Sequence, residues 1–226
     1  MRKIVTVILL LSSAALVIGQ TAIQGEGWRL NAYPYAEDIQ ELVNREIQDG
    51  YVPAGLHVVP GESIMVLFHE SDQEIDQWAL VAIDSLDRVN AEVSGFLQEG
   101  WLPVDFSMTG EDMHVLFLKT DYEFTSWRIV TATSDSDEAL LSIIGDVTKT
   151  QFDEDRILFG VNALGNQVHL LFVDSDTLLA NSQMAVQVYP NDGEAFYNAL
   201  NEHLAAGAVP GGFALSQDRV VIPFFR

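Results

Sequence analysis

The sequence contains no cysteine and very little lysine. Without cysteine, the chain can form neither disulfides nor thiolate metal sites, and it cannot carry the lipid anchor that bacterial lipoproteins attach to a cysteine. Its 11 lysine and arginine residues face 33 aspartate and glutamate residues, giving a formal net charge of −22. Because phosphate groups are bound mainly by lysine and arginine, this balance argues against nucleic-acid binding and against anionic lipid surfaces. Hydrophobic residues make up 48% of the chain, so the carboxylates coat a folded body.

Recognisable catalytic motifs are absent from the sequence as well. There is no Gly-x-Ser-x-Gly segment, no Gly-x-Gly-x-x-Gly segment and no phosphate-binding loop. Glu62 and Glu111 recur in hairpin turns and could suggest the paired carboxylates of glycoside hydrolysis, but Asn166 and Asp218 fill the same place in the other repeats, so turn propensity explains them. We therefore expect a protein that is not an enzyme and needs no cofactor.

Residues 1–19 have the pattern of a secretory signal peptide. Arg2 and Lys3 precede an apolar run that ends at Ile18, and the residues up to Gly19 suit cleavage by signal peptidase. The alternative is an uncleaved anchor, but a membrane span needs about 20 apolar residues and this run is shorter. We expect a periplasmic or secreted protein with no transmembrane segment after cleavage.

A pattern of one strand, one helix and two further strands recurs four times along the chain. The first strands begin at Trp28, Trp78, Trp127 and Met184, and each is followed by apolar residues at helical spacing and then by a hairpin with high β propensity. The sequence therefore predicts an α+β fold of four tandem βαββ repeats, with mainly antiparallel three-stranded sheets each covered by one helix. The repeats span residues 28–70, 78–119, 127–173 and 184–226. Units this small are not stable alone, so we expect them to pack pseudo-symmetrically on one another.

Helix boundaries and one strand position can also be predicted. N-caps are expected at Ser85, Asp135 and Asn191, and left-handed glycines are expected after three of the helices, at Gly50, Gly100 and Gly207. Pro223 cannot donate a ladder hydrogen bond, which predicts an edge or a bulge at that position.

The hairpin start resembles that of short bacterial βαββ domains of unknown function, which carry a Gly-Trp-x-Pro segment. Repeat 2 matches best, with Gly100-Trp101-Leu102-Pro103 and a last strand that ends at Lys119. Repeats 1 and 4 keep the glycine and the proline but carry Tyr51 and Ala208 in place of the tryptophan, and repeat 3 lacks all three residues. The resemblance implies a fold and no catalytic residues.

His114 and His169 occupy equivalent strand positions in adjacent repeats. If those repeats pack together, the two imidazoles could hold a metal ion such as zinc. The alternative is a position that tolerates a half-buried polar residue, since Met65 and Val221 fill it in the other repeats.

Two other residue groups allow either a functional or a structural interpretation. The acidic clusters around Asp72, Asp135, Asp153 and Asp174 could bind calcium, but none has the twelve-residue calcium loop, and solvated loops or helix caps explain them. The tryptophans that begin three repeats could stack on sugars, yet Met184 at the fourth position favours a role in the core.

These observations predict an exported, non-enzymatic protein that meets partners through surfaces between its repeats. The partner is expected to be a protein or a small ligand. The first alternative is a carrier of a small ligand or metal, and the second is a carbohydrate-active protein.

Overall fold

The computed structural model describes residues 23–35, 38–110, 112–174, 184–216 and 218–226, so the predicted signal peptide lies outside the described residues. After a short strand, β1 (Ile23–Gly25), the same order of elements occurs four times. The four units comprise β2 (Trp28–Pro34), α1 (Gln40–Gln48), β3 (Tyr51–Val59) and β4 (Ser63–Glu70); β5 (Trp78–Ile83), α2 (Leu86–Gln98), β6 (Trp101–Thr109) and β7 (Asp112–Lys119); β8 (Trp127–Thr133), α3 (Asp137–Phe152), β9 (Arg156–Leu164) and β10 (Gln167–Asp174); and β11 (Met184–Pro190), α4 (Gly193–Ala205), β12 (Val209–Pro210), β13 (Ala214–Leu215) and β14 (Arg219–Phe225).

Each unit forms its own antiparallel sheet, with the last strand in the middle. The strand orders are β2-β4-β3, β5-β7-β6, β8-β10-β9 and β11-β14-β12, with β13 also pairing with β14 and with β1 added beside β2. The predicted α+β fold of repeated βαββ units is confirmed.

Helix termini agree with the sequence in most respects, with two caps displaced by one residue. Ser85 is the N-cap of α2, as predicted. The caps of α3 and α4 are Ser136 and Asp192, one residue after the predicted Asp135 and Asn191. These two predictions were wrong, because the side chains of Ser136 and Asp192 accept hydrogen bonds from N–H groups of the first turn, whereas the side chains of Asp135 and Asn191 are hydrogen-bonded to residues outside the helix.

A left-handed residue follows each of the four helices, one residue after the C-cap in three units and two residues after it in the third. Gly50, Gly100 and Gly207 have φ values of +89°, +78° and +77°, as expected. In the third unit, no glycine follows the helix, and Asp155, two residues after the C-cap residue Asp153, adopts the left-handed conformation with φ +63°.

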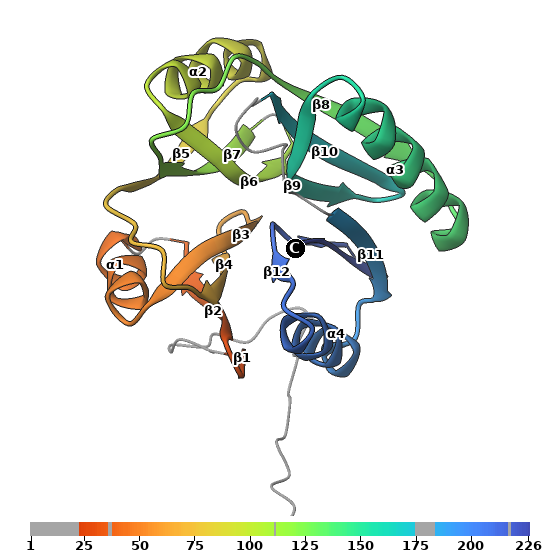
Figure 1. The fold of residues 1–226 in the computed structure, drawn as a ribbon, viewed down its shortest axis with the longest axis horizontal. Helices are drawn as coiled ribbons and strands as arrows, with labels where there is room; N and C mark the ends of the chain where they lie inside the picture. The colour runs from red at the N-terminus through yellow and green to blue at the C-terminus, as the bar shows by residue number, and fades with distance from the viewer. Residues whose placement is uncertain (1–22, 36–37, 111, 175–183, 217) are drawn as a thin grey trace, which may run out of the picture.

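The four units are arranged around a common centre. Figure 1 shows the helices on the outside and the inner strands β3, β6, β9 and β12 facing one another in the middle. Among the described residues, no helix is long and apolar enough to cross a membrane.

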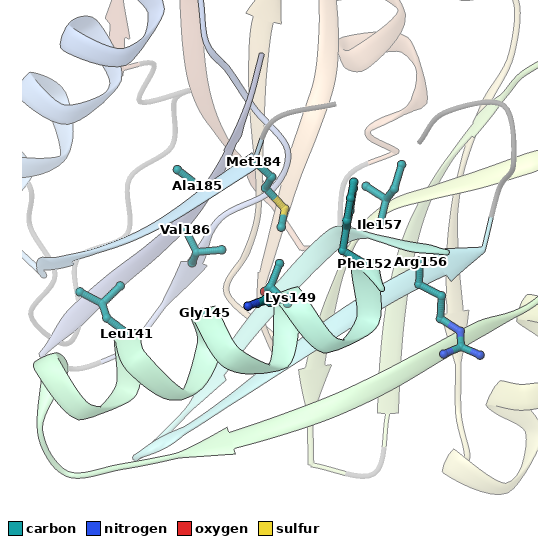
Figure 2. A pocket seen from close by; sticks show the side chains of 10 residues that line it. Leu141, Gly145, Lys149, Phe152, Arg156, Ile157, Met184, Ala185 and Val186 are labelled. Carbon is teal, nitrogen blue, oxygen red and sulfur yellow. The ribbon is translucent and has the colours of Figure 1, made fainter. Parts of the chain in front are cut away.

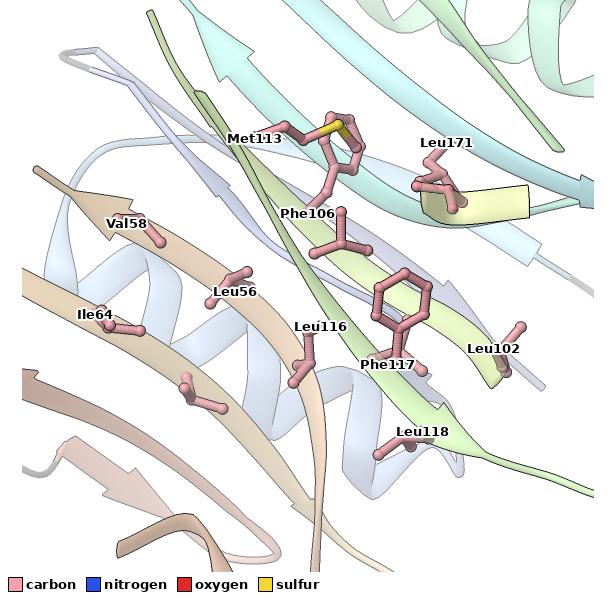
Figure 3. Close-up of a cluster of buried hydrophobic side chains, with 14 of the residues drawn as sticks. Leu56, Val58, Ile64, Leu102, Phe106, Met113, Leu116, Phe117, Leu118 and Leu171 are labelled. Atoms are coloured by element: carbon pink, nitrogen blue, oxygen red, sulfur yellow. The ribbon is translucent and has the colours of Figure 1, made fainter. Parts of the chain in front are cut away.

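Hydrophobic cores are shared between neighbouring units. The largest core, part of which is drawn in Figure 3, joins units 1 and 2 and also includes Leu171 and Val173 of β10. A second core joins unit 3 to Ala214 and Val221 of unit 4. The third joins Trp28 of unit 1 to Phe213 of unit 4, so the four units form a closed ring around the common centre. Because each core draws on more than one unit, the units stabilise one another.

Pro223 lies in the middle of its sheet, not at an edge, since β14 pairs with β11 on one side and with β12 and β13 on the other. The proline is tolerated because its partner is interrupted there: β12 ends at Pro210 and β13 begins at Ala214. The carbonyl of Pro223 accepts a hydrogen bond from the N–H of Gly211.

Candidate functional site

One carboxylate occupies the centre of the ring. Asp105 is fully buried, and the corresponding residues of the other inner strands are Gly55, Gly160 and Gly212. A Cβ atom at Gly160 or Gly212 would lie 3.0 Å or 3.1 Å from Oδ1 of Asp105. The centre therefore holds one side chain, because three of the four units carry no side chain at this position.

The carboxylate of Asp105 joins all four units. Its oxygens accept hydrogen bonds from the backbone N–H groups of Leu56 at 2.7 Å, Val161 at 2.9 Å and Phe213 at 3.1 Å, and it also accepts from Phe106. Burial raises the pKa of Asp105 well above the usual carboxyl range, and the four N–H groups oppose that rise. Because its oxygens are occupied by backbone groups, Asp105 is a structural link.

Polar side chains continue along the inner strands beside Asp105. Ser107 accepts a hydrogen bond from the N–H of Val58 at 3.0 Å. His57 is packed near the ring of Phe213, and burial lowers the pKa of His57 to about 4. Burial thus keeps this imidazole neutral at physiological pH.

We call the contact between the first strand of one unit and the helix of the preceding unit a seam. Indole rings lie at three of the four seams. Trp28 donates its Nε1–H to Oδ1 of Asn201 at 2.9 Å, Trp78 donates to Oδ1 of Asn44 at 2.7 Å, and Trp127 donates to Oγ of Ser94 at 3.2 Å. In every case the first strand of one unit contacts the helix of the preceding unit, with unit 4 preceding unit 1. The acceptors are equivalent, since each lies five residues before the C-cap residue of its helix (Asp49, Glu99 and Ala206).

The seam between units 3 and 4 differs from the other three. Met184 begins β11 where the others begin with tryptophan, so no indole N–H is available. Five residues before the C-cap residue Asp153 lies Thr148, whose Oγ1 is buried and has no hydrogen-bond partner among the described residues. This seam therefore keeps the acceptor and lacks the donor.

A groove of about 430 Å³ lies at this same seam, between α3 and β11. Figure 2 shows Leu141, Gly145 and Lys149 along α3, with Met184 and Val186 on β11 facing the helix. The full lining, which also includes two residues of β9, is Leu141, Gly145, Thr148, Lys149, Phe152, Arg156, Ile157, Met184, Ala185 and Val186. Most of these side chains are apolar.

Two cationic residues, Lys149 and Arg156, line the groove. Arg156 is engaged by Glu154. No carboxylate in the described part of the chain forms an ion pair with the Lys149 ammonium. The groove thus combines an apolar lining, one buried hydroxyl oxygen and two cationic side chains, of which Arg156 is paired with Glu154.

A second and larger cavity, of about 770 Å³, lies at the seam between units 1 and 4. Its lining includes the carboxylates of Glu26, Glu70 and Asp72 together with Tyr197 and Asn201. Unlike the seam between units 3 and 4, this seam contains an indole, since the Nε1–H of Trp28 is hydrogen-bonded to Asn201.

The structure places the two histidines that were predicted to bind metal in different sheets. His114 is buried on β7 beside the ring of Tyr35, and His169 on β10 shares a hydrogen bond of 2.9 Å with Thr131. Burial lowers the pKa of both imidazoles. Over the described ranges, no three histidine, aspartate or glutamate side chains converge as a metal site would require. The metal site at His114 and His169 stays a prediction, which elemental analysis of protein purified without chelator would test.

No family model, curated protein or solved structure matches this chain. The geometry of the seams is therefore the basis for any functional conclusion.

Two residues that prove central, Asp105 and Thr148, were not singled out by the sequence. Aligning the repeats places Asp105 with three glycines, and aligning the helix ends places Thr148 with Asn44, Ser94 and Asn201. Only the second alignment, combined with Met184, indicates an incomplete seam.

Proposed function

We propose that this chain is an exported binding protein that acts without catalysis and holds a small, partly apolar ligand between units 3 and 4. The observation that carries the proposal is the unfilled seam: Met184 stands in place of a tryptophan, beside a groove of about 430 Å³. Ligand sites in proteins are typically clefts of roughly 300–1,000 Å³, mostly apolar and with a few polar groups. The groove has this size and composition.

The charge of the groove suggests which ligands it accepts. Lys149 provides a cation at the groove in a protein whose net charge is −22. At 0.1 M salt, charges more than about 10 Å away are largely screened, so the ammonium has the greatest effect on a bound group near it. An apolar ligand with one carboxylate or sulfonate fits this arrangement.

Filling the groove from within the chain tests the proposal. In Met184→Trp, the new indole should occupy the space and donate to Thr148, as in the other seams. We expect binding of 1-anilinonaphthalene-8-sulfonate and of decanoate, measured by fluorescence and calorimetry, to fall at least tenfold. The unfolding free energy should rise by about 0.5–2 kcal/mol, the usual gain from filling a cavity.

Gln187→Trp is the matched control, because it adds a tryptophan to β11 at a residue that does not line the groove. Its binding of both probes should equal that of the wild type. If neither probe binds the wild type, or if Met184→Trp binds them as well as the wild type does, the proposed function is wrong.

A further inference from the structure

The three complete seams describe a site for an indole ring. In each, an indole lies between the first strand of one unit and the helix of the preceding unit, and its N–H is bonded to a side-chain oxygen of that helix at 2.7–3.2 Å. The same arrangement occurs at the fourth seam, where β11 contacts α3. Residues that would receive an indole are therefore present where the chain supplies none.

The buried oxygen of Thr148 is the second observation. A buried hydroxyl without a partner costs free energy, and such groups are uncommon in folded proteins. Thr148 Oγ1 is one of the few side-chain atoms in the described residues that are buried and unpartnered. It lies at the position from which Asn44, Ser94 and Asn201 accept an indole N–H. A ligand with a ring N–H would give this oxygen its missing hydrogen bond.

The rest of the groove suits a flat ring with a short substituent. Gly145 leaves the middle of α3 without a side chain, and a Cβ atom there would meet nothing within 4 Å. Leu141 and Phe152 extend the apolar lining along the helix, and Met184 faces them from β11 (Figure 2). Met is a flexible, polarisable side chain that contacts aromatic rings favourably. The cavity exceeds what one indole needs, which leaves room for a short acidic side chain near Lys149.

We infer that the groove binds an indole compound carrying a short carboxylate side chain, with the ring N–H donated to Thr148 and the carboxylate near Lys149. This inference rests on the proposed function, since it names the ligand class of the same groove. The site is thus a seam completed by a ligand where the other three are completed by tryptophan.

Calorimetric titration of the mature chain with two probes separates ring chemistry from shape. Indole-3-acetate has the ring N–H, whereas 1-naphthaleneacetate has a similar bicyclic ring and carboxylate without it. We expect the wild type to bind indole-3-acetate about fivefold to tenfold more tightly, the difference that one hydrogen bond makes.

Single substitutions then assign each contact. Thr148→Val keeps the shape and removes the hydroxyl, so the preference for indole-3-acetate over 1-naphthaleneacetate should disappear. Lys149→Gln should weaken both probes by a similar factor, about threefold to tenfold. Thr150→Val, which removes an exposed hydroxyl bonded to the carbonyl of Asp146, is the control and should change neither affinity.

The outcomes distinguish this inference from the proposed function. If 1-naphthaleneacetate binds the wild type as tightly as indole-3-acetate does, the groove binds apolar anions and the indole inference is overturned. Binding of indole-3-acetate that survives in Met184→Trp places the ligand elsewhere and overturns it as well. If the wild type binds neither indole-3-acetate nor decanoate nor 1-anilinonaphthalene-8-sulfonate, both the indole inference and the proposed function are wrong.

Discussion

Asp105 shows how much can depend on one side chain in a small repeat protein. Backbone N–H groups from all four units point at its two oxygens, which lie far from solvent. A buried N–H group without an acceptor costs about 1–3 kcal/mol, so these donors together make the carboxylate difficult to replace.

Replacing Asp105 should destabilise the protein in proportion to the number of acceptors lost. Asp105→Asn keeps one oxygen and turns an NH₂ group toward at least one N–H donor, so we expect a loss of about 1–3 kcal/mol. Asp105→Ala removes every acceptor and leaves a cavity, and it should cost more. Urea unfolding measures both. A cost below about 0.5 kcal/mol for Asp105→Ala would contradict the central role of the carboxylate.

His57 should make the fold sensitive to acid. Its pKa of about 4 in the folded state lies below the ordinary value of 6.5, so the unfolded chain takes up the proton first as the pH falls. The stabilising contribution is complete above pH 6.5 and is lost as the pH approaches 4, by up to about 3 kcal/mol.

The variant His57→Gln cannot take up this proton. Its unfolding free energy, followed by urea unfolding between about pH 7 and pH 4, should fall less steeply than that of the wild type. Parallel curves for the two proteins would show that His57 does not titrate as described.

Among the elements, α3 departs most from the common pattern. It is the longest of the described helices, its unit has an aspartate where the others have a left-handed glycine, and its middle carries Gly145. Glycine inside a helix is less stable than alanine by roughly 0.5–1 kcal/mol. The groove thus coincides with a position where helix stability is reduced.

A pair of glycine substitutions separates helix stability from groove shape. Gly145 in α3 and Gly95 in α2 both border open space, since a Cβ atom at either position would meet nothing within 4 Å. We expect Gly145→Ala and Gly95→Ala each to raise the unfolding free energy by about 0.5–1 kcal/mol. Only Gly145→Ala should also weaken the binding of indole-3-acetate, as measured by calorimetry. Equal effects of the two variants on binding would show that Gly145 does not border the ligand.

The elements themselves were largely predictable, because they follow from local rules. Hydrophobic periodicity predicted the strands and helices of all four units, and the preference of glycine for the left-handed conformation predicted the residues that follow three of the helices. The caps at Ser136 and Asp192 were missed by one residue, since a run such as Asp135-Ser136-Asp137 offers several side chains that can cap a helix. Which of these side chains accepts a hydrogen bond from the first turn depends on where the preceding strand ends relative to the helix.

The candidate site was less predictable, because it depends on contacts between units. Nothing local to Thr148 distinguishes it from any helical threonine. Its importance follows from Met184, which lies in the next unit, and from three other seams that show what is missing. Asp105 likewise gains its partners only when four strands that are far apart in the sequence meet.

At the level of the whole molecule, the ring admits one carboxylate at its centre but does not require it to come from unit 2. Gly160 faces Asp105 from unit 3, and a Cβ atom there would lie 3.0 Å from the Asp105 Cα atom. Gly160→Asp alone would place a second acid beside the first and should destabilise the protein by several kcal/mol.

Combining Gly160→Asp with Asp105→Gly should restore part of the lost stability. In the double variant the new carboxylate can accept the N–H groups that Asp105→Gly leaves free. We expect a coupling of about 1–3 kcal/mol between the two sites in a double-mutant cycle, measured by urea unfolding. If the two destabilisations simply add, the carboxylate must come from position 105, and a carboxylate at position 160 cannot replace it.

The single central acid also bears on how such a ring can be assembled. Four identical subunits, built by separate copies of one short gene, would each bring the same residue to the axis, so the middle would hold four mutually repelling acids or an empty space. Copies fused into one polypeptide can differ from one another at this position and at the seams, as identical subunits cannot. Covalent linkage therefore makes possible both the asymmetric centre and a single seam that differs from its three siblings.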